Sequence, residues 1–289
     1  MLSRDLQEKL RALSRGESTD ATPAADPSSE AESATRASPA APTVRTLDQL
    51  VHGVVAESAV GTCFVIEMPL AEFWPDAAKF TSRYLDVVSG AKARPGSQRI
   101  DETLLALLGR DPGGAVYFDI ETCGFAGTPV FLIGVMRVIN GRIVLHQYLA
   151  RDYGEEEAIL ARFADALAAA HTLISFNGRT FDWPFVADRA ALHRVALKAP
   201  PHVDLLHQSR RSFKRIVPDH KLQTLELFLC NRRRTGDIAG SAIPAAYHDF
   251  VRTGHATQLR DILQHNLLDL VTMAELVTFI LADEFPVKE

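Results

Sequence analysis

The sequence predicts an α/β fold, a mixed sheet flanked by helices, with a small α+β extension on its N-terminal side. Three β-rich runs stand within residues 115–150, an amphipathic helical pattern follows at 155–170, and a short apolar run comes at 173–176. The remainder is mostly helical in pattern. Three antiparallel strands, a helix, a further strand and more helices form an order that predicts one sheet covered by helices.

The three strands are predicted from their β-rich composition and from the turns between them. They read AVYFDIE (115–121), PVFLIGVMRVI (129–139) and RIVLHQYLA (142–150). Asn140-Gly141 separates the second run from the third, and Asn-Gly between apolar runs is the strongest short signal for a hairpin. We therefore expect these two strands to pair directly through a tight turn.

Helices are predicted after these strands. EEEAILARFADALAAA (155–170) carries apolar residues at helical spacing, and TFDWPFVADRAAL (180–192) follows the short buried strand LISF. The last helix is expected to run from about Thr257 to Ala282. With 47% apolar residues in a chain of 289, one large domain or two smaller ones can fill a substantial core.

The N-terminal part of the chain is predicted to have three sections. Residues 1–13 place four leucines at helical spacing, which predicts a short amphipathic helix, docked weakly on the domain or acting as a partner-binding arm. Residues 14–44 are rich in Ala, Pro, Ser, Thr and Glu, and this composition predicts a disordered linker. Residues 51–110 are expected to form an accessory region, a hairpin and helical pieces, that packs on the main domain at 113–283.

Bulk composition excludes several classes of protein. The net charge of −5 does not suit a chain that binds nucleic acid with its whole surface, although a local basic patch still can. Three cysteines without Cys-x-x-Cys spacing disfavour a disulfide framework or a zinc ribbon. The charged start does not resemble a signal peptide, and no apolar stretch reaches the ~18–20 residues of a membrane span. We expect a cytoplasmic protein with no membrane partner.

The first chemical signal is the pair Asp119 and Glu121 in VYFDIET. In a strand, residues i and i+2 point to the same face, so both carboxylates project together while Phe118 and Ile120 face the other side. Two neighbouring carboxylates repel, and a cation between them relieves that repulsion. The alternative is a strand end that carries two acids by chance. A phosphatase of the haloacid type would instead need a second Asp at the position of Glu121.

The second signal is Asp182 in FNGRTFDWPF, just after the strand LISF. Asn177-Gly178 predicts a turn, with glycine supplying a positive φ angle. Thr180 is a candidate cap for the next helix, so Asp182 should lie near that helix N-terminus, at the carboxyl end of a strand, where α/β sheets hold ligands. The alternatives are that Asp182 only complements the helix dipole, and that Asn177 stabilises the turn rather than binding substrate.

The third signal is His265 and Asp269 in HNLLDL, which share one helix face at i and i+4. An acid in so apolar a segment is costly unless it is paired or bound to metal. The imidazole of His265 has a near-neutral ordinary pKa, so it is a candidate general base for an attacking water. Its alternative is a histidine on a helix surface with no catalytic role.

Taken together, the three segments predict a two-metal nuclease site. Two Mg²⁺ or Mn²⁺ ions about 3.5–4 Å apart can stabilise the attacking and leaving oxygens of a phosphodiester, and such ions prefer carboxylate oxygen. The predicted metal ligands, which are also predicted to be catalytic, are Asp119, Glu121, Asp182 and Asp269. His265 is predicted to be a fifth catalytic residue.

A basic stretch at 202–234 stands out in this acidic chain. Its local excess of positive charge suggests a phosphate-contacting surface, and Phe213 among the cations is a candidate for stacking on a base. The alternative is a solvated helix face. The predicted substrate-binding residues are Asn177, Arg210, Arg211, Phe213 and Lys214.

The chain resembles a bacterial predicted-exonuclease family with an RNase H-like domain, within the DEDD superfamily of 3′→5′ exonucleases. The resemblance covers roughly residues 113–280 and rests on VYFDIET, EEEAIL, LISFNGRTFDWPF, HVDLLHQSRR, LQTLE, RTGDIAGSAIPAAY and HNLLD. It implies that the four acids hold two divalent metals. One departure is His265, which stands at the spacing of the tyrosine in Tyr-x-x-x-Asp, not at that of His-x-x-x-x-Asp, and this leaves its role open.

The sequence therefore predicts a metal-dependent 3′→5′ exonuclease that acts on the end of a DNA or RNA strand, with polarity implied by the resemblance alone. Two alternatives remain at this stage. One is an endonuclease on the same fold that cuts hybrids or structured ends, and the other is a nucleic-acid-binding module without activity. The intact set of four acids disfavours the second alternative.

Overall fold

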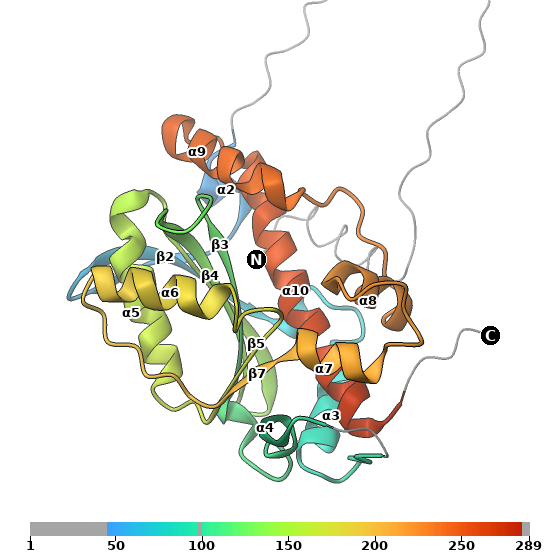
Figure 1. Ribbon diagram of the computed structural model, residues 1–289. Helices are drawn as coiled ribbons and strands as arrows, with labels where there is room; N and C mark the ends of the chain where they lie inside the picture. The colour runs from blue at the N-terminus through green and yellow to red at the C-terminus, as the bar shows by residue number, and fades with distance from the viewer. Residues whose placement is uncertain (1–44, 97–99, 285–289) are drawn as a thin grey trace, which may run out of the picture.

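The structure is a computed structural model that describes residues 45–96 and 100–284. The helix predicted at 1–13 and the linker predicted at 14–44 lie outside these described residues. Within them, one sheet of seven strands carries helices on both faces (Figure 1). This architecture confirms the predicted fold class, an RNase H-like α/β fold.

The sheet is mixed. Its strands lie in the order β1-β2-β5-β4-β3-β6-β7. The five strands from β1 to β3 pair antiparallel, whereas β6 pairs in parallel with β3 and β7 in parallel with β6. Their bounds are β1 Val54–Ser58, β2 Gly61–Pro69, β3 Ala115–Thr122, β4 Val130–Ile139, β5 Arg142–Leu149, β6 Thr172–Ser175 and β7 His202–Asp204. The short strand β7 was not predicted.

Two groups of helices cover the two faces of the sheet (Figure 1). On one face, the ring of Phe118 in β3 stacks on Phe163 of α5, with ring centroids 5.3 Å apart. On the other face, Asp119 is hydrogen-bonded by Asn266 of α10. The helices are α2 Leu47–Leu50, α3 Ala77–Val88, α4 Glu102–Leu105, α5 Glu156–Leu167, α6 Asp182–Leu192, α7 Leu205–Ser212, α8 Leu222–Leu229, α9 Ile243–Thr253 and α10 Thr257–Ala282.

The hairpin predicted between the second and third runs is present. Asn140 and Gly141 have φ angles of 50° and 72°, and two successive positive φ angles are what a tight type I′ turn requires. This turn joins β4 to β5 in the register that places Gly134 beside Gln147. That register matters for the site, because it aligns residues of three strands beneath α10.

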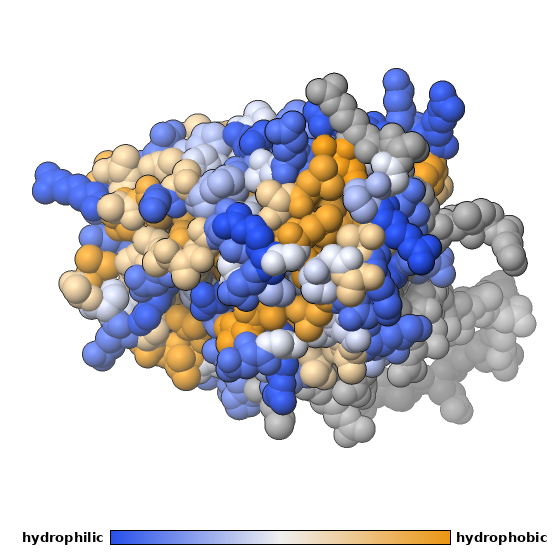
Figure 2. Space-filling model, turned by 90° about the horizontal axis from the view of Figure 1, so that it is seen from below, coloured by the Kyte–Doolittle hydropathy of each residue, from blue (hydrophilic) through white to orange (hydrophobic). Residues whose placement is uncertain are grey.

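The predicted accessory region is continuous with the main sheet. Its hairpin, β1 and β2, joins the sheet through pairing of β2 with β5. Helix α3 packs beside α10, and the Tyr117 hydroxyl donates to the Tyr84 hydroxyl of α3 at 3.1 Å. The accessory region and the main domain therefore share one core. Seen from below, the surface carries apolar patches separated by hydrophilic side chains (Figure 2).

Helix α10 is the central helix of the core. By length and composition alone it is apolar enough to cross a membrane, so the expectation that no such stretch exists was wrong. However, 78% of its most apolar 18-residue stretch is buried inside the fold. The apolar character of α10 is explained by its packing against the sheet and α3, since a helix enclosed by protein carries apolar residues on nearly every side.

Candidate functional site

Strand β3 places Asp119 and Glu121 on the face of the sheet that α10 covers. The neighbouring Phe118 packs with α5 on the opposite face, so the alternation expected of a strand holds. Both carboxylates are half-buried at the carboxyl end of β3. The end of this strand therefore presents two acids side by side toward the interior.

The loop after β6 brings Asp182 to the same place. The positive φ angle in this loop belongs to Asn177, at 62°, rather than to Gly178 as expected. Gly178 is needed for a different reason: a Cβ atom there would lie 2.3 Å from Ser175 Oγ and 3.1 Å from Asp182 Oδ2. Asp182 is 6% exposed. The expected cap by Thr180 is absent, since Phe181 is the N-cap and makes no side-chain cap bond.

Asp204, at the end of β7, ties this loop to the next helix. Its carboxylate accepts hydrogen bonds from the backbone N–H groups of Asn177 at 2.9 Å, Arg179 at 3.2 Å and Leu206 at 3.0 Å. A carboxylate occupied by three donors is engaged in shaping the backbone. Asp204 thus supports the position of Asp182 from the neighbouring strand.

Asp269 and His265 come from α10 and lie on one face of it. His265 Nε2 is 3.5 Å from Asp269 Oδ2, and His265 Nδ1 is 2.8 Å from Asp237 Oδ1. Arg234 forms an ion pair with Asp269, and its Nε donates to Glu226 at 2.6 Å. Asp269 therefore has two cationic partners, and the charged neighbours Asp237 and Arg234 were not assigned roles at this site from the sequence.

Burial and, after it, mutual repulsion govern the ionisation of three of the acids. Burial, followed by the charges of Asp269, Asp182 and Glu121, raises the pKa of Asp119 well above its usual range. Burial also raises the pKa of Glu121 to about 8, against the opposing effect of His265, and that of Asp182 to about 7. These carboxylates are not all ionised together at neutral pH without a compensating cation.

The same charges act on His265 in the opposite sense. Burial alone lowers the pKa of its ring, but the hydrogen bond to Asp237 and the charges of Asp269 and Glu121 outweigh burial and raise the pKa to about 9. In this state the imidazole carries a proton on both nitrogens at neutral pH. Whatever neutralises Asp269 and Glu121 also lowers the pKa of His265.

The donor set fits a hard divalent cation, because it consists of carboxylate oxygens. Among the residues that the structure describes, no three acidic, histidine or cysteine side chains are already drawn together closely enough to hold an ion. Two of the acids are engaged by other side chains: Arg234 pairs with the carboxylate of Asp269, and Asn266 donates to Asp119 Oδ2 at 2.9 Å. An ion held by Asp269 Oδ1 would take the place of Arg234 at that oxygen.

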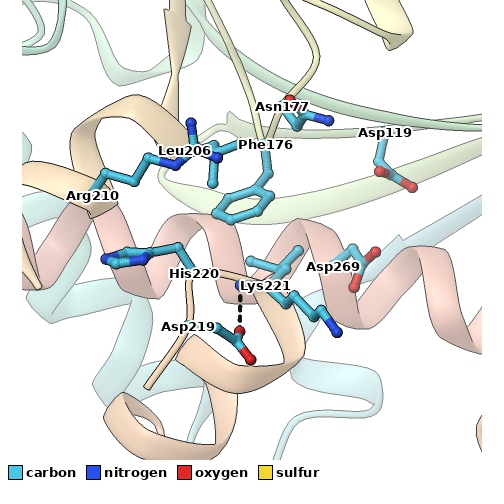
Figure 3. A pocket seen from close by; sticks show the side chains of 10 residues that line it. Asp119, Phe176, Asn177, Leu206, Arg210, Asp219, His220, Lys221 and Asp269 are labelled. Atoms are coloured by element: carbon cyan, nitrogen blue, oxygen red, sulfur yellow. Dashed lines mark hydrogen bonds between the residues drawn. The ribbon is translucent and has the colours of Figure 1, made fainter. Parts of the chain in front are cut away.

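A groove of about 520 Å³ opens from this cluster. Asp119 and Asp269 lie at one end, Arg210 and His220 lie toward the other, and Phe176 stands between them (Figure 3). The lining also contains Asn177, Leu206, Asp219, Lys221 and Leu222. Acids at one end and basic side chains along the wall suit a ligand that brings phosphate groups to the acids.

The structure divides the predicted substrate-binding residues. Asn177 and Arg210 line the groove, whereas Arg211 and Lys214 are exposed and do not line it. Phe213 is fully buried, with 0% exposure, so the prediction that its ring stacks on a base is wrong. Phe213 directly follows α7, and its ring lies in the core while the flanking cations stay outside.

Two arginines of the basic stretch also belong to the interior. Arg232 donates to Thr272 at 2.9 Å and to Glu275 at 2.7 Å, and it lies over the ring of Trp74. Arg234 is held by acids of the site. These two cations do not belong to the predicted phosphate-contacting surface, because their guanidinium groups are paired inside the protein.

Exposed aromatic rings occur elsewhere, close to the acids in sequence. Phe125, four residues after Glu121, is 92% exposed, and Phe181, directly before Asp182, is 49% exposed. Both belong to loops that leave the carboxyl ends of β3 and β6. Sequence reasoning missed them because exposure at a loop tip has no periodic signal, although their nearness to the acidic motifs was visible.

One known protein is similar to this chain in sequence, and another is similar in structure. The uncharacterized protein YprB of Bacillus subtilis (strain 168) is 33% identical over 178 residues, which are 60% of this chain and 43% of YprB. The structure of the family B DNA polymerase from the hyperthermophilic archaeon Pyrobaculum calidifontis matches with a TM-score of 0.44 and 19% identity, over 56% of this chain and 24% of the polymerase. The chain spans less than half the length of either protein.

A model of the RNase H superfamily matches residues 116–281. The matched range is more than half of the chain and contains Asp119, Glu121, Asp182 and Asp269. It also contains five of the seven sheet strands, all but the first residue of β3 included, since β1 and β2 precede it. On the strength of this match, the chain belongs to the RNase H superfamily.

Proposed function

We propose that this chain is a divalent-metal-dependent nuclease, and more narrowly a 3′→5′ exonuclease acting on the end of a DNA or RNA strand. The observation that carries the proposal is the meeting of four acids from β3, α6 and α10. Burial and mutual repulsion raise the pKa of three of them, and a groove with basic side chains leads to them. Superfamily membership supports a nuclease, and the polarity rests on the resemblance to DEDD exonucleases.

The four acids would hold two Mg²⁺ or Mn²⁺ ions: Asp119, Glu121, Asp182 and Asp269. When bound, such ions supply an activated water and stabilise the charge that develops on the phosphodiester oxygens. A divalent ion that replaced Arg234 at Asp269 would bring two positive charges to the carboxylate where one leaves. The additional positive charge would compensate the neighbouring acids that repel Asp269.

His265 is proposed to handle the proton. Asp237 holds Nδ1, which leaves Nε2 as the nitrogen that faces the acids. A base must be unprotonated before it accepts a proton, and a pKa of about 9 keeps the ring protonated while Asp269 and Glu121 are uncompensated. Compensation of those carboxylates lowers the pKa of His265 and frees Nε2 to accept a proton from water.

The substrate is proposed to enter along the groove as a single strand. Arg210 and Lys221 are exposed and line the groove, so they can contact successive phosphates. Asn177 stands near Asp119 and can hydrogen-bond the strand backbone (Figure 3). The exposed ring of Phe125 offers a surface on which a base can stack, since every base has a π face.

A digest of end-labelled substrates tests this proposal. The full chain is incubated with 5′-labelled single-stranded DNA or RNA in Mn²⁺, Mg²⁺ or EDTA. An Asp119→Asn variant, which keeps the shape of the side chain and removes its negative charge, is treated in the same way. A ladder that shortens from the 3′ end, depends on metal and is lost in the variant is the expected result. The sugar preference follows from which strand is degraded.

The two other functions predict different products. Internal fragments without a ladder would indicate an endonuclease on the same fold. Binding of either strand that does not require metal, with no turnover in Mn²⁺ or Mg²⁺, would indicate a binding module. Either result would overturn the exonuclease proposal.

A further inference from the structure

Three strands place a row of residues directly beneath α10. Gly134 of β4 pairs with Asp119 of β3 on one side and with Gln147 of β5 on the other. Neighbouring strands lie about 4.7–4.9 Å apart, so Asp119 and Gln147 are separated by two such spacings. Because Gly134 has no side chain, the row contains a gap at its centre.

Asn266 of α10 fills that gap. A Cβ atom on Gly134 would lie 2.0 Å from Asn266 Oδ1, so a larger residue there would displace the amide. Both Asn266 and Gln147 are buried, at 0% and 1% exposure. Asn266 thus bridges Asp119 and Gln147 above the glycine, in an interior where every polar group needs a partner.

The hydrogen bonds in this bridge have a fixed direction. Gln147 Nε2 donates to the backbone oxygen of Leu263 at 2.8 Å and to Asn266 Oδ1 at 2.9 Å. A backbone carbonyl only accepts, so it is the NH₂ group of Gln147 that must face Leu263. With its own oxygen taken by Gln147, Asn266 must present its NH₂ group to Asp119.

The chain of donors ends on one oxygen of the carboxylate. Asn266 Nδ2 donates to Asp119 Oδ2 at 2.9 Å and, more weakly, to the backbone oxygen of Asp119 at 3.3 Å. Within the described residues, Asp119 Oδ1 accepts no hydrogen bond. A neutral amide thus holds this carboxyl group in place without bringing a compensating charge to it.

We propose that Gln147 is a positioning residue for the metal site: acting through Asn266, it fixes Asp119 Oδ2 and leaves Oδ1 to the ion. This inference rests on the proposed function, because it assigns a role in holding the ion to a residue that never touches it. Groups that orient metal ligands typically change metal affinity 10- to 100-fold when they are replaced. Without Gln147, the amide of Asn266 is free to turn its oxygen toward Asp119.

The test compares Gln147→Met with Thr278→Val. Methionine keeps the length of the glutamine side chain but removes both donors. Thr278 is buried on α10, the helix that carries Asn266. Its hydroxyl donates to the backbone oxygen of Ala274 at 2.8 Å, so its replacement also removes a buried hydrogen bond. Mn²⁺ is titrated calorimetrically into each full-length protein without nucleic acid, and thermal melting reports the loss of stability.

The expected result is a dissociation constant for Mn²⁺ about 10-fold weaker in Gln147→Met and within about twofold of wild type in Thr278→Val. Equal Mn²⁺ affinity in wild type and Gln147→Met would overturn the inference. Equal weakening in both variants would overturn it too, because general loosening of the fold would then explain the effect.

A second measurement separates this inference from the proposed function. The side-chain amide signals of Asn266 are followed by NMR in metal-free protein, where they should shift in Gln147→Met and in Asp119→Asn. If the wild-type protein binds no Mn²⁺, the proposed function fails. The NMR signals then decide on their own whether Gln147 orients the side-chain amide of Asn266. Unchanged signals in Gln147→Met would overturn the positioning role whatever the metal result.

Discussion

Asp119 and Asp269 belong to one cluster, yet the protein holds them in different ways. Asp119 is fixed by the neutral amide of Asn266, which is itself held by Gln147. Asp269 is fixed by charged partners, Arg234 and His265. A neutral donor orients a carboxylate and leaves its charge available, whereas a guanidinium also neutralises it. The comparison suggests a rigid ligand on the sheet and an exchangeable one on α10.

Removing Arg234 should give the largest effect on stability. In Arg234→Gln, Asp269 and Glu226 lose a buried partner, and breaking a buried ion pair typically destabilises by about 3–5 kcal/mol. Calorimetric melting in EDTA should therefore show a Tm lower by roughly 6–20 °C. Saturating Mn²⁺ should restore part of this loss, because the ion takes over the compensation of Asp269.

Arg252 provides the matched control for that prediction. It pairs with Asp249 on the surface, where both side chains are well exposed, so Arg252→Gln should change the Tm little. If Arg234→Gln melts like Arg252→Gln in EDTA, Asp269 is not held by its guanidinium partner. The contrast between the two halves of the cluster would then be lost.

The stability of the metal-free protein should fall as the pH rises from about 5 to 9. The folded-state pKa values of Asp182 and Glu121, about 7 and 8, lie above their ordinary values of 3.8 and 4.5. In this window the native state binds more protons than the unfolded chain, so the free energy of unfolding decreases with pH. The raised pKa of His265 acts in the same direction, since its stabilising proton is lost near pH 9.

One substitution and one addition of metal test whether repulsion between the acids causes this decline. Asp182→Asn removes one repelling charge and should flatten the decline in Tm with pH, raising the metal-free Tm at pH 8 by several degrees. Saturating Mn²⁺ should flatten the decline in Tm with pH in the wild-type protein. A metal-free protein whose Tm stays constant or rises between pH 5 and 8 would show that the acids do not repel one another as described.

Asp237 should control the proton on His265. The hydrogen bond between Asp237 Oδ1 and His265 Nδ1 raises the pKa of the ring, and hydrogen bonds to charged groups contribute about 1.5–3 kcal/mol. In Asp237→Asn, the pKa of His265 should therefore fall by about one to two units, measured from its NMR titration in metal-free protein. An unchanged titration would show that Asp237 does not set the pKa of His265.

The smallest expected effect is on binding of the strand. Phe125→Ala should weaken the affinity for single-stranded DNA or RNA by about 1–3 kcal/mol, the typical contribution of one stacked base, with little change in Tm. Phe213→Leu should do the reverse, lowering the Tm because Phe213 lies in the core. Fluorescence anisotropy with a labelled oligonucleotide measures the first effect, and an unaltered affinity in Phe125→Ala would remove this ring from the substrate site.

Much of the fold was predictable because local patterns determine it. The strand period placed Asp119 and Glu121 on one face, and the Asn-Gly turn fixed the register of β4 and β5. Helix α10 has the bounds that its apolar pattern predicted. Each of these features depends on residues that are close together in the chain.

The rest of the site was not predictable, because it depends on contacts between distant residues. Arg234 lies in a run of cations, and nothing nearby reveals that it pairs with Asp269, 35 positions away. Gln147 and Asn266 are separated by 119 positions and meet only when the sheet and α10 have packed. Phe213 was misassigned for a similar reason, since flanking charges do not show which side of a short helix faces the core.

The most direct test of the central claim is anomalous diffraction from crystals of the full chain grown with Mn²⁺. We expect anomalous peaks beside the four carboxylates, with Arg234 withdrawn from Asp269 and Asn266 still donating to Asp119. The four are Asp119, Glu121, Asp182 and Asp269. Mn²⁺ at saturating concentration with no peak at these carboxylates, and with Arg234 still paired to Asp269, would contradict the central claim.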